Sequence, residues 1–144
     1  MDIIQSFQQS LQKIYDMGAV SSLMEFCQGE IRVLMYLNDN NKVVFPSDLS
    51  DALSVTRQRI ASVLSSLRKK GYVSMEIAEH DRRRMKVMLT AKGESFIVEK
   101  RNSAEAYVSH FIAAFGEENA KDMTRLIELS AEAMKALANT DEIR

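Results

Sequence analysis

The order of patterns in residues 54–93 constrains this chain most: a basic helical pattern, a glycine stop, and two short strand patterns around an arginine-rich tip. That order is the one a winged helix requires. Charge is segregated in the same way. Residues 57–101 carry twelve Lys and Arg against five Asp and Glu, a balance of +7, whereas residues 1–56 and 102–144 each balance at −4. A chain with a formal net charge of −1 therefore contains one segment suited to a polyanionic partner.

The helix expected from Thr56 to about Lys70 has an apolar and a polar face. Thr56 can cap its first turn, and Gly71 fits the left-handed position that ends many helices. The apolar face consists of Ile60, Val63, Leu64 and Leu67. The opposite face consists of Gln58, Ser62, Ser65 and Lys69, with Arg57 and Arg59 beside it. Short side chains such as Ser62 and Ser65 let a helix backbone approach the base edges in a major groove.

Gln58 is the residue expected to read a base. It lies in the first turn of the helix, and a glutamine can pair bidentately with N6 and N7 of adenine. Arg57 and Arg59 are expected either to read guanine or to hold phosphate. The alternative for all three residues is a solvated helix face with no specific partner.

Residues 73–78 and 84–89 alternate as two strands do, with apolar residues at Val73, Met75, Ile77, Met85, Val87 and Leu89. The turn between them is expected to contain residues 80–83. Arg82, Arg83 and Arg84 therefore lie at or beside its tip, preceded by Asp81. A rigidly held guanidinium suits the strong negative potential of a narrow minor groove. The alternative is a surface turn with incidental ion pairs, each of small energy.

The rest of the chain is patterned mainly as helices. They are expected at residues 2–17, about 25–38, 46–53, from a cap at Thr90 to residue 115, and about 117–138, with a short strand at 43–45. Phe45 would precede the helix at 46–53 and supplies no capping oxygen. The first and last helices are apolar on one face and net acidic, which favours pairing with a second subunit over contact with nucleic acid.

A spaced motif connects these elements: Leu67-Arg68-Lys69-Lys70-Gly71, then Asp81-x-Arg83, then Val87-x-Leu89-Thr90-x-x-Gly93. With FCQGEIRVLMYL and PSDLSDALSVT upstream, the chain resembles the MarR family of bacterial transcription regulators over nearly its whole length. The resemblance implies a fold that is mainly α with a small β-wing. This is a single domain over 1–144: a winged helix-turn-helix lobe at 26–94, with dimerisation helices at 1–25 and 95–144.

The resemblance also implies a function. A homodimer would bind double-stranded DNA at a pseudo-palindromic operator as a repressor, with Arg83 in the minor groove, Asp81 orienting Arg83 or a neighbouring cation, and Arg82 and Arg84 facing phosphates. Thr90 and Gly93 have structural roles, as a helix cap and a close-packing position. Whether a small-molecule effector alters the spacing of the recognition helices is left open by the sequence.

Other function classes find little support in the sequence. No Ser/His/Asp set, glycine-rich phosphate loop or cofactor motif indicates an enzyme, and the two histidines lack the neighbours of a metal site. The single cysteine, Cys27, is expected to be a small buried hydrophobe, with thiol-based redox sensing as the alternative. No secretory signal or membrane segment is recognisable, so we expect a cytoplasmic protein. A winged helix that docks protein instead of DNA is the competing function, but it has no need of three arginines in its wing.

Overall fold

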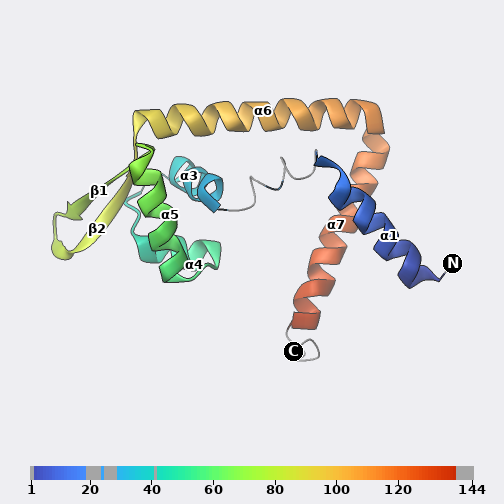
Figure 1. Ribbon diagram of the computed structural model, residues 1–144, viewed down its shortest axis with the longest axis horizontal. Helices are drawn as coiled ribbons and strands as arrows, with labels where there is room; N and C mark the ends of the chain where they lie inside the picture. Colours follow the sequence, from blue (N-terminus) through green and yellow to red (C-terminus); the bar gives the residue numbers. More distant parts are fainter. Residues whose placement is uncertain (1, 19–23, 25–28, 41, 139–144) are drawn as a thin grey trace. The chain divides into compact units, whose positions relative to one another are not determined.

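The computed structural model describes residues 2–18, 24, 29–40 and 42–138, which fall into two compact units, Met1–Arg101 and Asn102–Arg144. Within these described ranges the chain forms six helices and one two-stranded antiparallel sheet (Figure 1). In order they are α1 (Ile3–Asp16), α3 (Gly29–Asp39), α4 (Pro46–Leu53), α5 (Arg57–Lys69), β1 (Val73–Ala78), β2 (Asp81–Leu89), α6 (Ala91–Phe115) and α7 (Glu117–Ala138). The predicted fold class, mainly α with a small β-wing, is confirmed.

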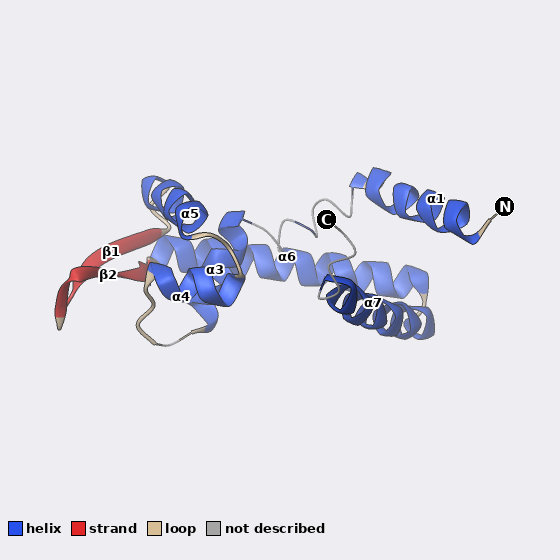
Figure 2. Cartoon of the chain, turned by 90° about the horizontal axis from the view of Figure 1, so that it is seen from below, coloured by secondary structure: helices blue, strands red, loops and turns tan. Residues whose placement is uncertain are grey.

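One hydrophobic core holds α3, α4, α5, the base of the hairpin and the start of α6 together, and we call this assembly the winged-helix lobe (Figure 2). Its buried side chains are Val33, Leu34, Leu37, Val44, Leu49, Leu53, Ile60, Leu64, Leu67, Val73, Val87 and Ile97. Burying one such side chain completely stabilises the fold by about 1.5–3 kcal/mol. Because Ile97 is among them, the first turns of α6 are part of the lobe.

Helix α5 begins and ends where its sequence signals placed it. The hydroxyl of Thr56 accepts a hydrogen bond from the Arg59 N–H at 3.2 Å, which satisfies one of the free donors of the first turn. Gly71 follows the helix with φ of +79°, a left-handed conformation that costs glycine little. Ile60, Leu64 and Leu67 are buried, so the predicted apolar face does point into the core.

The segment before α4 resolves the capping question that Phe45 raised. The Asp48 carboxylate accepts the Phe45 N–H at 2.8 Å, the reciprocal half of a capping box, and the Asp48 N–H, which a capping side chain would bind, donates to the Phe45 carbonyl at 3.0 Å. The strand predicted at 43–45 is reduced to a single bridge, in which Val44 pairs with Val87 of β2. The Val87 N–H donates to the Val44 carbonyl at 2.8 Å, which fastens this segment to the hairpin.

The hairpin differs from its prediction at the tip. The turn consists of Glu79 and His80, and β2 already begins at Asp81, so residues 81–83, which were predicted to lie in the turn, belong to the strand. Ile77 pairs with Met85, but the next residue of β1, Ala78, pairs with Asp81. The three arginines at 82–84 therefore form a bulge with no opposite residues. An alternating sequence pattern carries no information about such an insertion.

The outer half of the hairpin extends beyond the core. Val73 and Val87 at its base are buried, but Ile77 is 60% exposed and Met85 is 38% exposed. The period-2 pattern predicted the strands correctly and did not predict this exposure, because the pattern cannot show where the supporting helices end. The wing is therefore a two-stranded arm whose tip is reachable by a partner.

Helices α1 and α7 have no buried residue, and α6 buries only Gly93 and Ile97. Their bounds agree with the helices predicted at 2–17, from Thr90, and at 117–138, and Gly116 separates α6 from α7 with φ of +95°. The helix predicted at 25–38 is observed as Gly29–Asp39, and its first part lies outside the described residues. None of the helices in the described ranges is long and apolar enough to cross a membrane.

Candidate nucleic-acid interface

Helix α5 presents an exposed polar strip on the side away from the core. The strip consists of Gln58, Ser62, Ser65 and Lys69, and all four residues are exposed. Their spacing of four, three and four residues places them along one line on the helix surface. Arg57 and Arg59 are also exposed and lie in the first turn beside Gln58. The structure thus brings the predicted α5 residues onto one surface whose side chains are short at its centre.

Asp81 fixes the backbone of the wing tip. Its carboxylate accepts the Arg83 N–H at 3.0 Å, the arrangement of an Asx turn, and lies 3.5 Å from Nε of the same arginine. The Arg83 side chain is 93% exposed, so the ion pair is solvated and worth little by itself. The main role of Asp81 is therefore to accept this backbone hydrogen bond, which orients the backbone from which the Arg83 side chain projects.

The cations of the wing occupy different environments. Arg82, Arg83 and Arg84 are all exposed, but Arg84 also contacts an aromatic ring: its guanidinium carbon lies 3.6 Å from the ring centroid of Phe45. Lys86 forms an ion pair of 3.4 Å with Glu76, its cross-strand neighbour. The sequence analysis gave Arg82 and Arg84 the same role, facing phosphates. The contact with Phe45 depends on residues 39 positions apart and has no local signal.

Hydrogen bonds connect the C-terminal end of α5 to the N-terminal end of α6, and we call this set of contacts the clasp. Thr90 accepts the Gly93 N–H through its hydroxyl at 3.0 Å, which makes it the cap of α6. The same hydroxyl donates to the Gly71 carbonyl at 2.7 Å, and the Thr90 N–H donates to the Tyr72 carbonyl at 3.1 Å. The ammonium group of Lys92 donates a hydrogen bond at 2.8 Å to the carbonyl of Lys70, the C-cap residue of α5. The predicted cap is confirmed, and the clasp shows that α5 and α6 are tied to each other.

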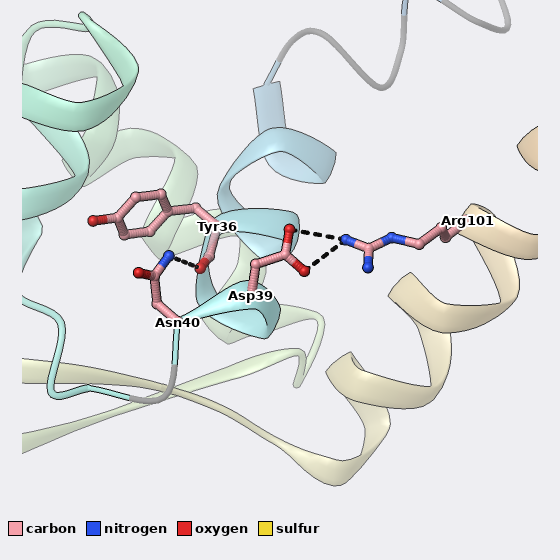
Figure 3. A network of polar contacts seen from close by, with 4 residues as sticks. All are labelled: Tyr36, Asp39, Asn40 and Arg101. Atoms are coloured by element: carbon pink, nitrogen blue, oxygen red, sulfur yellow. Dashed lines mark hydrogen bonds and ion pairs between the residues drawn. The ribbon is translucent and has the colours of Figure 1, made fainter.

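Two ion pairs connect α3 to the C-terminal end of α5 and to α6. Lys70 contacts Glu30 at 2.6 Å. Arg101 of α6 donates through Nη2 to both carboxylate oxygens of Asp39 at 2.8 and 3.0 Å, as Figure 3 shows. Beside Asp39, the Asn40 amide donates to the Tyr36 carbonyl at the end of α3. The two ion pairs join residues 40 and 62 positions apart, so no local sequence spacing predicts them.

Glu30 shows the electrostatic consequence of the first pair. Partial burial raises the pKa of this carboxyl, but hydrogen bonds from Lys70 and Ser66 and the charge of Lys70 together lower it below its ordinary value. A carboxylate whose pKa is lower in the folded state stabilises the fold above the unfolded pKa, and this contribution is lost as the pH falls through the folded value. The pair therefore supports the lobe at neutral pH and weakens in acid.

Two sequence expectations concern groups other than this surface. Cys27 lies outside the described residues. Among the residues that the structure describes, no group of three or more His, Cys, Asp and Glu side chains lies together as a metal site would require. A hollow of about 370 Å³ does lie beside the wing, lined by Val43, Phe45, Ala78, Glu79, His80, Asp81, Arg84 and Lys86.

Comparison with protein families places this lobe. Residues 28–84 match the model of the MarR family. The matched part of the lobe is similar to the MarR family. The matched segment runs from the start of α3 to Arg84, so the MarR-family match includes the whole α5 strip and all three wing arginines. No relative was found among curated proteins.

Solved structures of similar fold cover almost the whole chain. Streptococcus pneumoniae FabT in complex with DNA is 22% identical, with a TM-score of 0.73 over 93% of this chain and 99% of that one. Staphylococcus aureus MepR in its DNA complex is 17% identical, with a TM-score of 0.66 over 92% and 98%. A MarR transcriptional regulator from Methanosarcina mazei is 21% identical, with a TM-score of 0.64 over 92% and 99%. At these identities the likeness concerns the fold.

Proposed function

We propose that this protein is a sequence-specific, DNA-binding transcription regulator that acts as a homodimer. The observation that carries the proposal is the exposed polar strip of α5, flanked by Arg57 and Arg59, on a lobe whose wing carries the exposed Arg82 and Arg83 close to its turn. A helix with short side chains fits a major groove, and a fixed arginine on a hairpin fits the adjacent minor groove. FabT and MepR, of similar fold, have structures in complex with DNA, which supports the proposal.

In this mechanism Gln58 reads a base, Ser62 and Ser65 permit close approach, and Lys69 meets phosphate. Arg57 and Arg59 read guanine or hold phosphate, Arg82 faces phosphate, and Arg83 enters the minor groove with its backbone held by Asp81. Two α5 helices related by a two-fold axis would contact half-sites about 34 Å apart, one turn of DNA. The operator is then pseudo-palindromic.

The experiment that tests DNA binding uses the full-length protein. Bound fragments would be selected from a genomic DNA library at moderate salt, and the enriched sequence would be placed in a fluorescein-labelled duplex. Enrichment of an inverted repeat with half-sites one turn apart is the expected result. If no sequence is enriched and all duplexes bind alike, the regulator function is wrong and the protein-docking alternative gains support.

Replacing Arg83 with alanine should weaken binding to that duplex by roughly tenfold, the order expected for one well-placed groove arginine. The plot of log affinity against log salt should also become shallower, since fewer counterions are released. Fluorescence anisotropy across a salt titration measures both quantities. Arg125→Ala, in the acidic helix α7, is the matched control and should bind as the wild type does. Unchanged affinity of Arg83→Ala would remove the wing tip from the mechanism.

The homodimer is proposed from the apolar side chains that one chain leaves exposed outside the lobe. Phe7 is 59% exposed, Leu126 is 54% exposed and Ile127 is 56% exposed, and similar residues follow along α1, α6 and α7. A single-chain protein rarely keeps so many large apolar side chains in water. We propose that residues 1–25 and 95–144 pair with their copies in a second subunit, and that residues 26–94 bind DNA.

Replacing Phe7 with glutamate should convert the protein from a dimer to a monomer at micromolar concentration, because a charge would be buried at the apolar face of α1. Size-exclusion chromatography with light scattering gives the mass. Gln9→Glu, on the opposite side of the same helix, should remain dimeric. A dimer of undiminished stability in Phe7→Glu would exclude α1 from the interface.

Repression follows in this proposal where the operator overlaps a promoter, and we place the protein in the cytoplasm with the DNA it binds. A small molecule can regulate it only by binding more tightly to one arrangement of the two recognition helices than to the other. A reporter fused to the selected operator tests repression: deleting the regulator should raise expression, and a fall in expression would indicate an activator.

A further inference from the structure

We infer that Phe45 is a positioning residue for the wing and that Arg84 is its anchor instead of a phosphate contact. The inference rests on the proposed DNA binding. The observation is the stacking of the Arg84 guanidinium on the Phe45 ring, at 3.6 Å from guanidinium carbon to ring centroid. The family resemblance implied that Arg84 faces phosphate together with Arg82. The ring contact gives Arg84 a partner within the protein.

Backbone hydrogen bonds hold Phe45 and its neighbour Val44 in place. Its own N–H donates to the Asp48 carboxylate at 2.8 Å, and the neighbouring Val44 carbonyl accepts the Val87 N–H at 2.8 Å. Phe45 itself is extended, with φ of −109° and ψ of 158°, so its side chain points to the opposite side from the buried Val44. The ring is thereby fixed between the start of α4 and the flank of β2.

Arg84 occupies a part of the hairpin that lacks such support. It belongs to the bulge of residues 82–84, which have no opposite residues in β1, and Ile77 and Met85 next to it are exposed. The hollow of about 370 Å³ lies along this flank, so the core does not brace the outer half of β2. The planar guanidinium of Arg84 on the aromatic face of Phe45 connects the bulge to the residue that precedes α4.

The contact therefore sets the inclination of the wing relative to the helix-turn-helix. α4 leads directly into α5, so the same lobe that carries the recognition strip also carries the ring on which Arg84 rests. One residue earlier in the bulge, Arg83 has its backbone held by Asp81. Asp81 orients Arg83 within the wing, and Phe45 through Arg84 orients the wing toward the groove.

The test compares binding of Phe45→Leu, Phe45→Tyr, Arg84→Ala and the double variant Phe45→Leu/Arg84→Ala to the selected fluorescein-labelled duplex over a range of salt. Loss of one exposed cation–π contact should weaken binding by about 2- to 5-fold. We expect this loss in Phe45→Leu with an unchanged salt slope, and recovery in Phe45→Tyr, which keeps the aromatic face. The double variant should be no weaker than Arg84→Ala alone.

Arg82→Ala is the contrast, because loss of a phosphate contact should lower the salt slope by about 0.9 for each contact removed. The inference is wrong if Arg84→Ala lowers the slope in that way while Phe45→Leu binds as the wild type does. A readout without DNA is the side-chain Nε–H resonance of Arg84, which the ring current should shift in the wild type and in Phe45→Tyr. The shift should vanish in Phe45→Leu, and a resonance that does not respond to the ring overturns the contact.

The experiment distinguishes a failure of the proposed function from a failure of the positioning role. If the wild type selects no duplex, the proposed function falls and the positioning role falls with it. If the wild type binds a selected duplex and Phe45→Leu behaves identically to it in slope, affinity and resonance, only the positioning role falls. Thermal unfolding of each variant is measured alongside, and Phe45→Tyr together with Arg84→Ala decides the outcome if Phe45→Leu does not fold.

Discussion

Replacing Gly93 with alanine is expected to destabilise the protein by about 3 kcal/mol or more, the upper end of the range for overpacking a filled site. A Cβ atom at this position would overlap the carbonyl oxygen of Tyr72 and lie 2.9 Å from Leu89 Cδ1. The oxygen belongs to the backbone and already accepts the Thr90 N–H at 3.1 Å, so it cannot turn away. The start of α6 would have to move from the end of α5, and the clasp between them would open.

Urea unfolding followed by circular dichroism, at one fixed protein concentration, measures this loss of unfolding free energy. Gly18→Ala is the matched control, because a Cβ atom there would meet nothing within 4 Å. The control should change the unfolding free energy by less than about 1 kcal/mol. Equal stability of Gly93→Ala and the wild type would show that α6 does not pack on Tyr72 as closely as the structure has it.

Local chemistry explains why so much of the fold could be predicted from the sequence. Thr56 and Thr90 cap helices because their hydroxyls reach N–H groups three residues on, and Gly71 ends α5 because glycine tolerates a positive φ. Such signals depend on neighbours within a few positions, so they survive in a sequence read alone. The same holds for the buried face of α5, which follows from helical periodicity.

The contacts that differentiate the site depend on distant residues and could not be predicted. Arg84 stacks on Phe45 because a bridge between Val44 and Val87 brings their two segments together. Nothing in the sequence around Val44 or Val87 predicts that bridge. The bulge of the wing could not be predicted either. The alternating pattern indicates which residues share a face of the strand, but it does not indicate how many residues are unpaired. The sequence therefore located the basic surface, and the structure distinguished the environments of its cations.

Replacing Ser62 with glutamate is expected to reduce affinity for the selected duplex on the order of 100-fold or more, with the fold intact. Ser62 lies in the middle of the exposed strip of α5, between Gln58 and Ser65. Glutamate is too long for close approach to the base edges, and its negative charge would face phosphates in both half-sites of the dimer. Opposing like charges across an interface costs several kcal/mol, and each 1.4 kcal/mol corresponds to a factor of about ten.

The structural reason to expect an intact fold is that Ser62 is exposed and that glutamate has at least the helix propensity of serine. Circular dichroism and thermal unfolding check this, and fluorescence anisotropy measures the affinity. Ser95→Glu is the matched control, since Ser95 is an exposed residue of α6 in the same lobe, next to Glu94, where the basic strip does not extend. It should bind within about threefold of the wild type, the scale of one distant screened charge. If Ser62→Glu and Ser95→Glu bind equally well, then α5 does not enter the groove, because a carboxylate buried without a partner between base edges and phosphates lowers affinity.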